Sequence, residues 1–338
     1  MVAIASAPAF ATATDINDVT RVFHEQRAYW PRIRNTTAAE RIATLKRFRA
    51  ALLQHRPRLL AAAYTDLHKP PIETDLAEIL FLTDEIRYTA QHLEHWMRPR
   101  PVETPISHFG TRSAIRYEPR GVGLIIAPWN YPFSLTLGPL IGAIAAGCCA
   151  IIKPSEYTPH CSHAIRELVA DVFDAREVAV IEGDHSVAQE LLALPFNHIY
   201  FTGSPQVGQI VMRAAADHLA SVTLELGGKS PLIVDHTVDV AEAAGQIVYG
   251  KYQNCGQTCI APDYVLAHRA IHDELIDAIS RRIGAVYGAT ETAQKQSPVY
   301  GRIVNTRHHQ RLRRLYETAV ADGARQAYGG GSDPAERF

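Results

Sequence analysis

The chain has 338 residues, of which 47% are hydrophobic and 20% charged; this composition is typical of globular proteins, and the length favours about two domains. Its 34 basic and 35 acidic residues leave a formal net charge of −1, so no basic field indicates a nucleic acid partner. We therefore expect chemistry on a small molecule.

The first residues, MVAIASAPAFATATDIND, contain no Lys or Arg and no sustained apolar core, so they do not read as a secretory signal. No run of about eighteen apolar residues occurs, which argues against a membrane span. An odd number of cysteines in a chain of this size favours reduced thiols; they are Cys148, Cys149, Cys161, Cys255 and Cys259. We expect a cytoplasmic protein.

The N-terminal hundred residues read as helical. Apolar residues recur at helical spacing over residues 38–66, and Pro57 is expected to interrupt that helix. A second helix is predicted from Asp75 to Arg98, before Pro99. One apolar stripe is expected along it, made of Leu76, Ile79, Leu80, Ile86, Leu93, Trp96 and Met97. The proline-rich stretch that follows alternates as an exposed hairpin would.

From Gly121 onward, short apolar runs alternate with helical stretches. The runs are GLIIAP, AIIKP, EVAVIEG, HIYFTG, VTLELGG and PLIVD. This alternation predicts an α/β fold with a largely parallel sheet covered on both faces. Such sheets bind ligands at the carboxyl ends of their strands.

Two glycine patterns need interpretation. Gly121-Val122-Gly123 is interpreted as a turn, because apolar residues follow where a dinucleotide fingerprint needs its third glycine. The segment from Gly203 to Gly208 is no P-loop, because Gln and Ile stand where that motif needs Lys and Ser or Thr. Ser204 as a cap and Pro205 near the helix start would still present backbone N–H groups to an anion such as a pyrophosphate. An ordinary strand-to-helix turn is the alternative.

The stretch YQNCGQTCIAPDYV holds Cys255 and Cys259 four residues apart. There is no second cysteine pair downstream, and His268, His308 and His309 fit no finger-like spacing, so we expect no structural metal site. Either a reactive thiolate or an inert packed thiol is left.

Five stretches, in this order, resemble the NAD(P)-dependent aldehyde dehydrogenase superfamily. They are Pro128-Trp129-Asn130-Tyr131-Pro132, Lys153-Pro154-Ser155-Glu156, Phe201-Thr202-Gly203-Ser204, Leu224-Glu225-Leu226-Gly227-Gly228-Lys229 and Gly256-Gln257-Thr258-Cys259. The tetrad KPSE and the residues APDYV look most like the class 3 branch, which acts on fatty or aromatic aldehydes. The resemblance runs from about residue 20 to the end.

The resemblance implies a division of the chain into four parts. Residues 1–100 would be the N-terminal helical part of the cofactor domain, and residues 101–120 an oligomerisation-type protruding β-hairpin. Residues 121–228 would form the Rossmann-like NAD(P)-binding domain, and residues 229–338 an incomplete α/β catalytic domain.

The resemblance also implies roles for individual residues. Cys259 would be the nucleophile, the Asn130 amide with the Cys259 backbone N–H would stabilise the oxyanion, and Glu225 would be the general base. The implied cofactor-binding residues are Trp129, Lys153, Glu156, Gly203, Ser204, Gly208, Leu226 and Gly227. A carboxylate at Glu156 near the adenosine ribose favours NAD, with NADP as the alternative. Cys255 would be a bystander near the end of a helix from Val238 to Asn254, which Gly256 would end.

The sequence also departs from the family pattern. A Glu-x-Phe-Gly-Pro motif, whose glutamate contacts the nicotinamide ribose, and a C-terminal strand used in oligomerisation are absent after Ala261. We therefore expect a C-terminally truncated chain of an enzyme that forms a homodimer at full length. Two alternatives are an impaired relative that binds nucleotide or a partner, and a cofactor-independent cysteine esterase, which would need a histidine base near Cys259.

Overall fold

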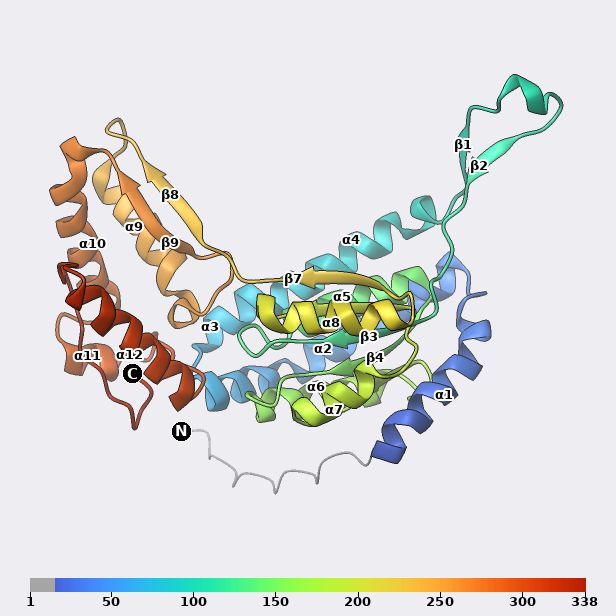
Figure 1. The fold of residues 1–338 in the computed structure, drawn as a ribbon, viewed down its shortest axis with the longest axis horizontal. Helices are drawn as coiled ribbons and strands as arrows, with labels where there is room; N and C mark the ends of the chain where they lie inside the picture. Colours follow the sequence, from blue (N-terminus) through green and yellow to red (C-terminus); the bar gives the residue numbers. More distant parts are fainter. Residues whose placement is uncertain (1–15) are drawn as a thin grey trace.

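The computed structural model describes residues 16–338, so the expectation about a secretory signal lies almost wholly outside the described residues. Figure 1 shows a central body from which two arms project on the same side. The body contains a parallel sheet with helices on both faces, one arm is a thin hairpin, and the other arm holds the C-terminal helices and two strands. None of the helices in the described part is both long and apolar enough to span a bilayer.

The N-terminal part is helical. Its elements are α1 (Ile16–Ile33), α2 (Ala38–Leu67), α3 (Pro71–Thr74), the π-helix η1 (Asp75–Leu80) and α4 (Phe81–Trp96). A capping box starts α2, because the Thr37 hydroxyl accepts the Glu40 N–H while the Glu40 carboxylate accepts the Thr37 N–H at 2.7 Å.

The predicted interruption at Pro57 is wrong, since α2 runs through it as one helix of 30 residues. A proline inside a helix costs about 3 kcal/mol. Leu52 and Leu59, on either side of it, are both fully buried in the same hydrophobic cluster. Their packing outweighs the lost backbone hydrogen bond.

The single apolar stripe predicted over residues 75–98 is also only partly correct. Ile79, Ile86 and Leu93 are buried, whereas Leu76 and Leu80 are 54% and 49% exposed, and Trp96 is exposed as well. The segment begins with a π turn, whose wider i→i+5 bonding shifts the helical phase. Leu76 and Leu80 of this first turn therefore fall out of line with the buried residues of α4.

The exposed hairpin is confirmed. Strands β1 (Arg100–Val102) and β2 (Ser113–Ile115) pair antiparallel, with a short 3-10 helix, η2 (Ile106–His108), between them. At its tip Ile106 and Phe109 are 89% and 91% exposed. This hairpin is the thin arm that leaves the body in Figure 1.

The body contains a five-stranded sheet that is parallel throughout, as predicted. Its strands lie in the order β5-β4-β3-β6-β7 and are β3 (Val122–Ile126), β4 (Cys149–Lys153), β5 (Val178–Val180), β6 (His198–Thr202) and β7 (Ser221–Glu225). The chain reverses its direction across the sheet at β3, which has β4 on one side and β6 on the other.

The turn predicted at Gly121-Val122-Gly123 is wrong for its last two residues, which already belong to β3. Only Gly121 precedes the strand, at a φ of +137°, and a Cβ there would lie 2.0 Å from the Asn197 Oδ1. The same Asn197 oxygen accepts the Val122 N–H at 2.9 Å. Residue 121 is glycine because its backbone lies so close to the Asn197 side chain that a Cβ would clash with it.

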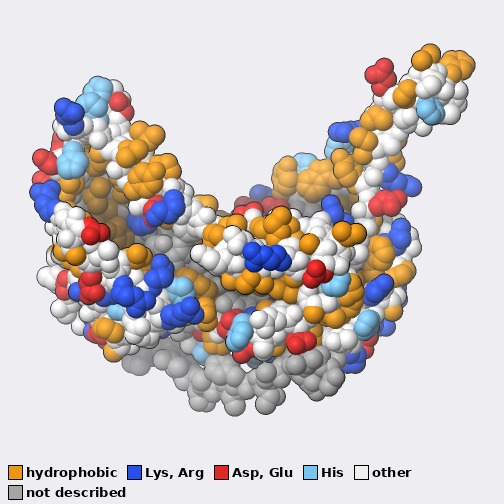
Figure 2. Space-filling model, viewed as in Figure 1, with side chains coloured by type: hydrophobic (Ala, Val, Ile, Leu, Met, Phe, Trp, Pro, Cys, Tyr) orange, Lys and Arg blue, Asp and Glu red, His pale blue; other side chains and the backbone are white. Residues whose placement is uncertain are grey.

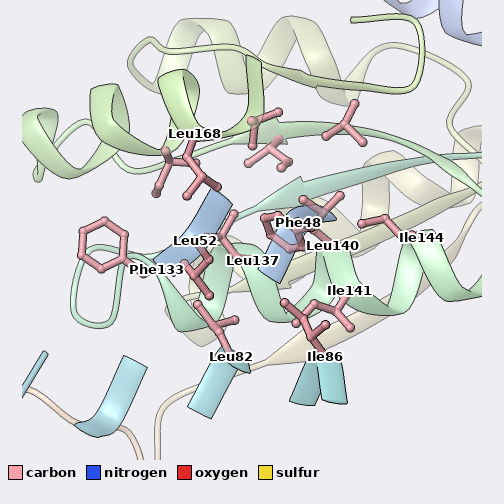
Figure 3. Packing of buried hydrophobic residues seen from close by; sticks show 14 of the residues in the cluster. Phe48, Leu52, Leu82, Ile86, Phe133, Leu137, Leu140, Ile141, Ile144 and Leu168 are labelled. Carbon is pink, nitrogen blue, oxygen red and sulfur yellow. The ribbon is translucent and has the colours of Figure 1, made fainter. Parts of the chain in front are cut away.

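Helices cover both faces of this sheet. They are α5 (Ser134–Ala146), α6 (Pro159–Val172), α7 (His185–Leu192) and α8 (Pro205–Asp217), together with α1, α2 and α4. Alternation along β3 sends Leu124 into the cluster with α1, α7 and α8, and Ile125 into the cluster with α2, α4, α5 and α6. Figure 3 shows the second of these clusters, in which Phe48 and Leu140 come from different helices.

The second arm is built on two parallel strands, β8 (Ser230–Val234) and β9 (Pro262–Ala267). Its other elements are α9 (Val240–Tyr252), the 3-10 helices η3 (Gln253–Gly256) and η4 (Arg269–Ile271), α10 (His272–Tyr287), α11 (Glu291–Lys295) and α12 (Thr306–Ala321). One face of the strand pair packs on α9 and α10 through Val234 and Leu275. On the other face Ile233 is 76% and Leu266 54% exposed, and Figure 2 shows hydrophobic side chains on this arm. A domain boundary after residue 228 stays a prediction.

The helix predicted from Val238 to Asn254 ends earlier, at Tyr252. Asn254 and Cys255 adopt left-handed conformations with φ of 49° and 56°, although neither is glycine, and Gly256 follows at φ 75°. Gly256 therefore lies inside a turn that has already begun and is not the residue that ends the helix.

Candidate active site

The predicted cofactor-binding residues follow four strands of the sheet at one edge. Trp129 follows β3, Lys153 ends β4, Gly203 follows β6 and Gly227 follows β7. Since these strands are parallel, their carboxyl ends share that edge, next to the position where the strand order reverses.

Lys153 and Glu156 form an ion pair at the end of β4. The Lys153 side chain is buried, and its Nζ donates to the Glu156 carboxylate at 2.8 Å and to the Pro154 carbonyl at 3.0 Å. The Glu156 side chain remains 35% exposed. The buried ammonium thus orients a carboxylate that can accept hydroxyl groups from a ligand.

The start of α8 has the predicted cap. The Ser204 hydroxyl accepts the Val207 N–H at 3.3 Å, and Pro205 is the first helical residue. A Cβ on Gly208 would lie 2.9 Å from the Leu226 Cδ2, and one on Gly203 would lie 2.5 Å from the Phe201 ring. Both glycines therefore let α8 pack closely on the ends of β6 and β7.

Cys259 lies in the turn between η3 and β9 and is half-buried. A Cβ on Gly228 would lie only 2.5 Å from the Cys259 carbonyl oxygen, so the connection between β7 and β8 packs against the Cys259 backbone. The thiol is neither sealed in the core nor on an outer surface, and all five cysteines are free.

Three hydrogen bonds join the loop after β3 to the loop that carries Cys259. The Asn130 Nδ2 donates to the Gln257 carbonyl at 2.9 Å, and the Asn254 Nδ2 donates to the Asn130 carbonyl at 2.7 Å. The Tyr131 hydroxyl and the Thr258 hydroxyl are 2.8 Å apart. Burial raises the pKa of Tyr131 to about 12, so its phenol is neutral at physiological pH. The structure thus brings Asn130 and the neighbours of Cys259 together.

Glu225 is exposed at the end of β7, although both of its neighbours in the sequence are leucines. Leu224 and Leu226 pack toward α8 beside Gly208, and alternation along the strand turns Glu225 to the other side. In the part of the chain that the structure describes, no hydrogen bond or ion pair joins the Glu225 carboxylate to Cys259 or Asn130.

The sequence model of the aldehyde dehydrogenase family matches residues 5–337. The chain belongs to this family. Members are NAD(P)-dependent oxidoreductases that convert aldehydes to carboxylic acids through a cysteine. Family membership therefore agrees with the resemblance drawn from the five sequence stretches.

Similar proteins come from bacteria and mammals. The 4,4'-diaponeurosporen-aldehyde dehydrogenase of Staphylococcus aureus is 43% identical over 323 residues, which cover 96% of this chain and 69% of the relative. The dimeric NADP-preferring aldehyde dehydrogenase of Canis lupus familiaris is 40% identical and is matched over 88% of this chain and 64% of its own length. A substrate-bound structure of Staphylococcus aureus AldH has a TM-score of 0.88 at 42% identity, covering 95% of this chain and 69% of that one.

These matches confirm the α/β fold of an aldehyde dehydrogenase. The chain spans between 60% and 72% of the length of curated relatives that it matches.

Cys255 differs from Cys259 in its surroundings. Burial raises the pKa of the Cys255 thiol to about 11, although a hydrogen bond with Tyr300 acts in the opposite direction. The thiol is therefore protonated at neutral pH, as a bystander in this aldehyde dehydrogenase would be.

His308, at the start of α12, was not identified from the sequence as part of the site. Its ring centroid lies 5.4 Å from that of Trp129 and 6.2 Å from that of Tyr157. Burial, with Arg311 and Arg307 nearby, lowers the pKa of His308 and favours a neutral ring. No local pattern marks this residue, because only tertiary packing brings the start of α12 beside the loops that follow β3 and β4.

Proposed function

We propose that this aldehyde dehydrogenase chain oxidises an apolar aldehyde, with Cys259 as nucleophile, Asn130 as oxyanion donor and Glu225 as general base. The observation that carries the proposal is the direct hydrogen bonding between the Asn130 loop and the Cys259 loop. This contact lies next to the strand ends that carry the predicted cofactor residues.

The first step is attack by the Cys259 thiolate on the carbonyl carbon of the aldehyde, which forms a C–S bond and turns the carbonyl oxygen into an alkoxide. The Asn130 amide has two N–H groups, and the bond to the Gln257 carbonyl uses one of them. The second N–H, with the backbone N–H of Cys259, would stabilise the alkoxide.

The residues at the strand ends fit a dinucleotide. Glu156 supplies a carboxylate for ribose hydroxyls, Lys153 orients that carboxylate, and the Ser204-capped start of α8 faces the same edge. When NAD(P) is bound, its nicotinamide supplies the acceptor for the hydride that leaves the substrate carbon.

Glu225 would complete the reaction. As an exposed carboxylate at the end of β7 it can take a proton from water, which attacks the thioester on Cys259. The C–S bond breaks, the carboxylate product leaves, and the sulfur returns as a thiolate. The sum is one aldehyde, one water and one NAD(P)⁺ giving one carboxylate, one NAD(P)H and two protons.

We propose an apolar substrate, either aliphatic or aromatic, with NAD or NADP as cofactor. The name of the Staphylococcus aureus relative gives its substrate as the 4,4'-diaponeurosporen-aldehyde. The name of the canine relative describes that enzyme as dimeric and NADP-preferring. Ile260, directly after the nucleophile, is 80% exposed, as a side chain available to an apolar substrate would be. A homodimer is the proposed assembly.

The proposal is tested by incubating the purified chain with NAD or NADP and a series of aldehydes while following absorbance of the reduced nicotinamide. Cys259→Ala should lower turnover by about a thousandfold or more, whereas Cys255→Ala, the matched control, should retain it. Glu225→Gln should still form the acylated protein, detected by mass spectrometry, but should release product slowly.

Equal behaviour of the two cysteine variants would refute the assignment of the nucleophile. Ester hydrolysis that needs no nucleotide, without aldehyde oxidation, would instead support a cysteine esterase.

A further inference from the structure

A short segment near the two loops carries three charged residues that contact those loops and that the proposed chemistry does not use. It runs from Lys69 to Glu78, between the end of α2 and the middle of η1. Lys69 and Glu78 are both completely buried, and the Lys69 Nζ donates to the Glu78 Oε1 at 2.7 Å. A buried ion pair is costly to desolvate and adds little net stability, so its contacts call for an explanation.

Glu78 and Lys69 both contact the loop that contains Asn130. The second carboxylate oxygen of Glu78 accepts the N–H groups of Phe133 and Ser134, at 2.8 and 3.1 Å, where α5 begins. The Lys69 Nζ lies 3.8 Å from the centroid of the Tyr131 ring. The pair therefore holds this loop through residues that follow Asn130 in the chain, between Asn130 and α5.

Glu73 contacts the loop that contains Cys259. Its carboxylate accepts the backbone N–H of Asn254 at 2.9 Å. Asn254 is 1% exposed and has the left-handed φ of 49°, a conformation that is unfavourable for a residue other than glycine. Burial raises the pKa of Glu73, while the Asn254 hydrogen bond and Lys69 lower it. One segment thus holds both loops.

The π-helix explains how two carboxylates five residues apart reach neighbouring loops. In an α-helix with 3.6 residues per turn, residues five apart point about 140° away from each other. The i→i+5 bonding of η1, which contains Glu78, removes part of that angle. Such π turns are rare overall, but those that occur are often found at functional sites.

We propose that Lys69, Glu73 and Glu78 are positioning residues that fix the Asn130 loop relative to Cys259. The inference rests on the proposed roles of Asn130 and Cys259. These three residues touch neither substrate nor cofactor in this scheme; they act through backbone N–H groups of the two loops and through the ring of Tyr131.

The test uses the full chain and begins with Glu73, which is only partly buried. Glu73→Ala removes the acceptor for the Asn254 N–H, whereas Glu73→Gln keeps an acceptor oxygen. Asp75→Asn is the matched control, because Asp75 lies in the same turn but pairs with Arg56 at 2.5 Å on the outside of the protein. Lys69→Met combined with Glu78→Met removes both buried charges without leaving one unpaired, and it removes the acceptor of the Phe133 and Ser134 N–H groups.

We expect Glu73→Ala and the double variant to lower kcat by about ten- to a hundredfold with KM changed less than about threefold, since the loss is one of orientation. Glu73→Gln should recover most of the rate, and Asp75→Asn should stay within about twofold of the unsubstituted protein. The melting temperature of each variant shows whether a lower kcat comes from misplaced loops or from unfolded protein.

A second readout needs no turnover: the rate at which iodoacetamide alkylates Cys259, followed by mass spectrometry of its peptide. Glu73→Ala should slow this reaction about threefold or more, because the loop that carries Cys259 is then no longer held in one position through Asn254. If Glu73→Ala and the double variant match Asp75→Asn in kcat and in alkylation, the positioning role is overturned while the proposed function stands. If Cys259→Ala leaves turnover intact, the proposed function fails, and the alkylation rates still decide the positioning role.

Discussion

The two parallel sheets of this protein differ in how they are covered. The five-stranded sheet has a hydrophobic cluster on each face, whereas the pair β8–β9 packs on α9 and α10 with one face and leaves Ile233 and Leu266 open on the other. Parallel sheets are nearly always buried on both faces. The comparison shows that the apolar burial that stabilises the fold is concentrated around the five strands, while the arm keeps an apolar surface available for contact.

The largest expected effect is in the cluster of the five-stranded sheet. Phe48→Ala removes a fully buried side chain and should lower the free energy of unfolding by about 3–5 kcal/mol, as measured by urea denaturation. Leu53→Ala in the same helix is the control, because Leu53 is 44% exposed and should change stability far less. Similar losses for both variants would mean that burial in this cluster does not dominate stability.

Thiol labelling should reveal a difference of intermediate size between the two regions. Cys149 in β4 and Cys255 in η3 have thiol pKa values raised by burial to about 12 and about 11, so at pH 8 about one in ten thousand and one in a thousand are thiolate. The rates at which the two thiols are alkylated should both rise as the pH increases toward these pKa values, because a thiol stays protonated below its pKa.

After correction for the different thiolate fractions, we expect Cys255 to be alkylated about tenfold faster than Cys149 at pH 8. Local opening of the arm should need less free energy than opening of the five-stranded sheet. Alkylation resolved by mass spectrometry measures both rates. Cys255 labelled as slowly as Cys149 would show that the arm opens only with the whole protein.

The smallest effect is expected on the open face of β8. Ile233→Thr should change the free energy of unfolding by less than about 0.5 kcal/mol, and it should reduce any self-association seen by analytical ultracentrifugation. The neighbouring Val234→Thr is the matched variant: Val234 is 5% exposed, so the new hydroxyl is buried and should cost about 1–3 kcal/mol. A large loss for Ile233→Thr would show that this face is not open in solution.

Much of the body could be predicted because its signals are local. Short apolar runs separated by helical stretches predicted the parallel strands, and Ser204 followed by Pro205 predicted the start of α8. The features that were not predicted depend on distant contacts. The left-handed Asn254 is held by Glu73, which is 181 residues away along the chain, and the helix through Pro57 is held by side chains of several other helices.

The site divides in the same way. Parallel strands explain why Trp129, Lys153, Gly203 and Gly227 come to one edge. The meeting of Asn130 with Gln257, 127 residues apart, followed only from the resemblance to a family, because spacing alone does not bring those loops together. The buried pair Lys69–Glu78 had no sequence signal, since charged residues are normally expected at the surface.

The connection between β7 and β8 is the single place where the main chain passes from the body to the C-terminal arm, within the described residues 16–338. Gly228 lies in this connection, and its Cα is so near the Cys259 carbonyl that no side chain fits between them. The one crossing of the chain is therefore tied by close packing to the backbone that carries the sulfur. A side chain as small as that of alanine at position 228 would clash with the Cys259 carbonyl and should displace that backbone.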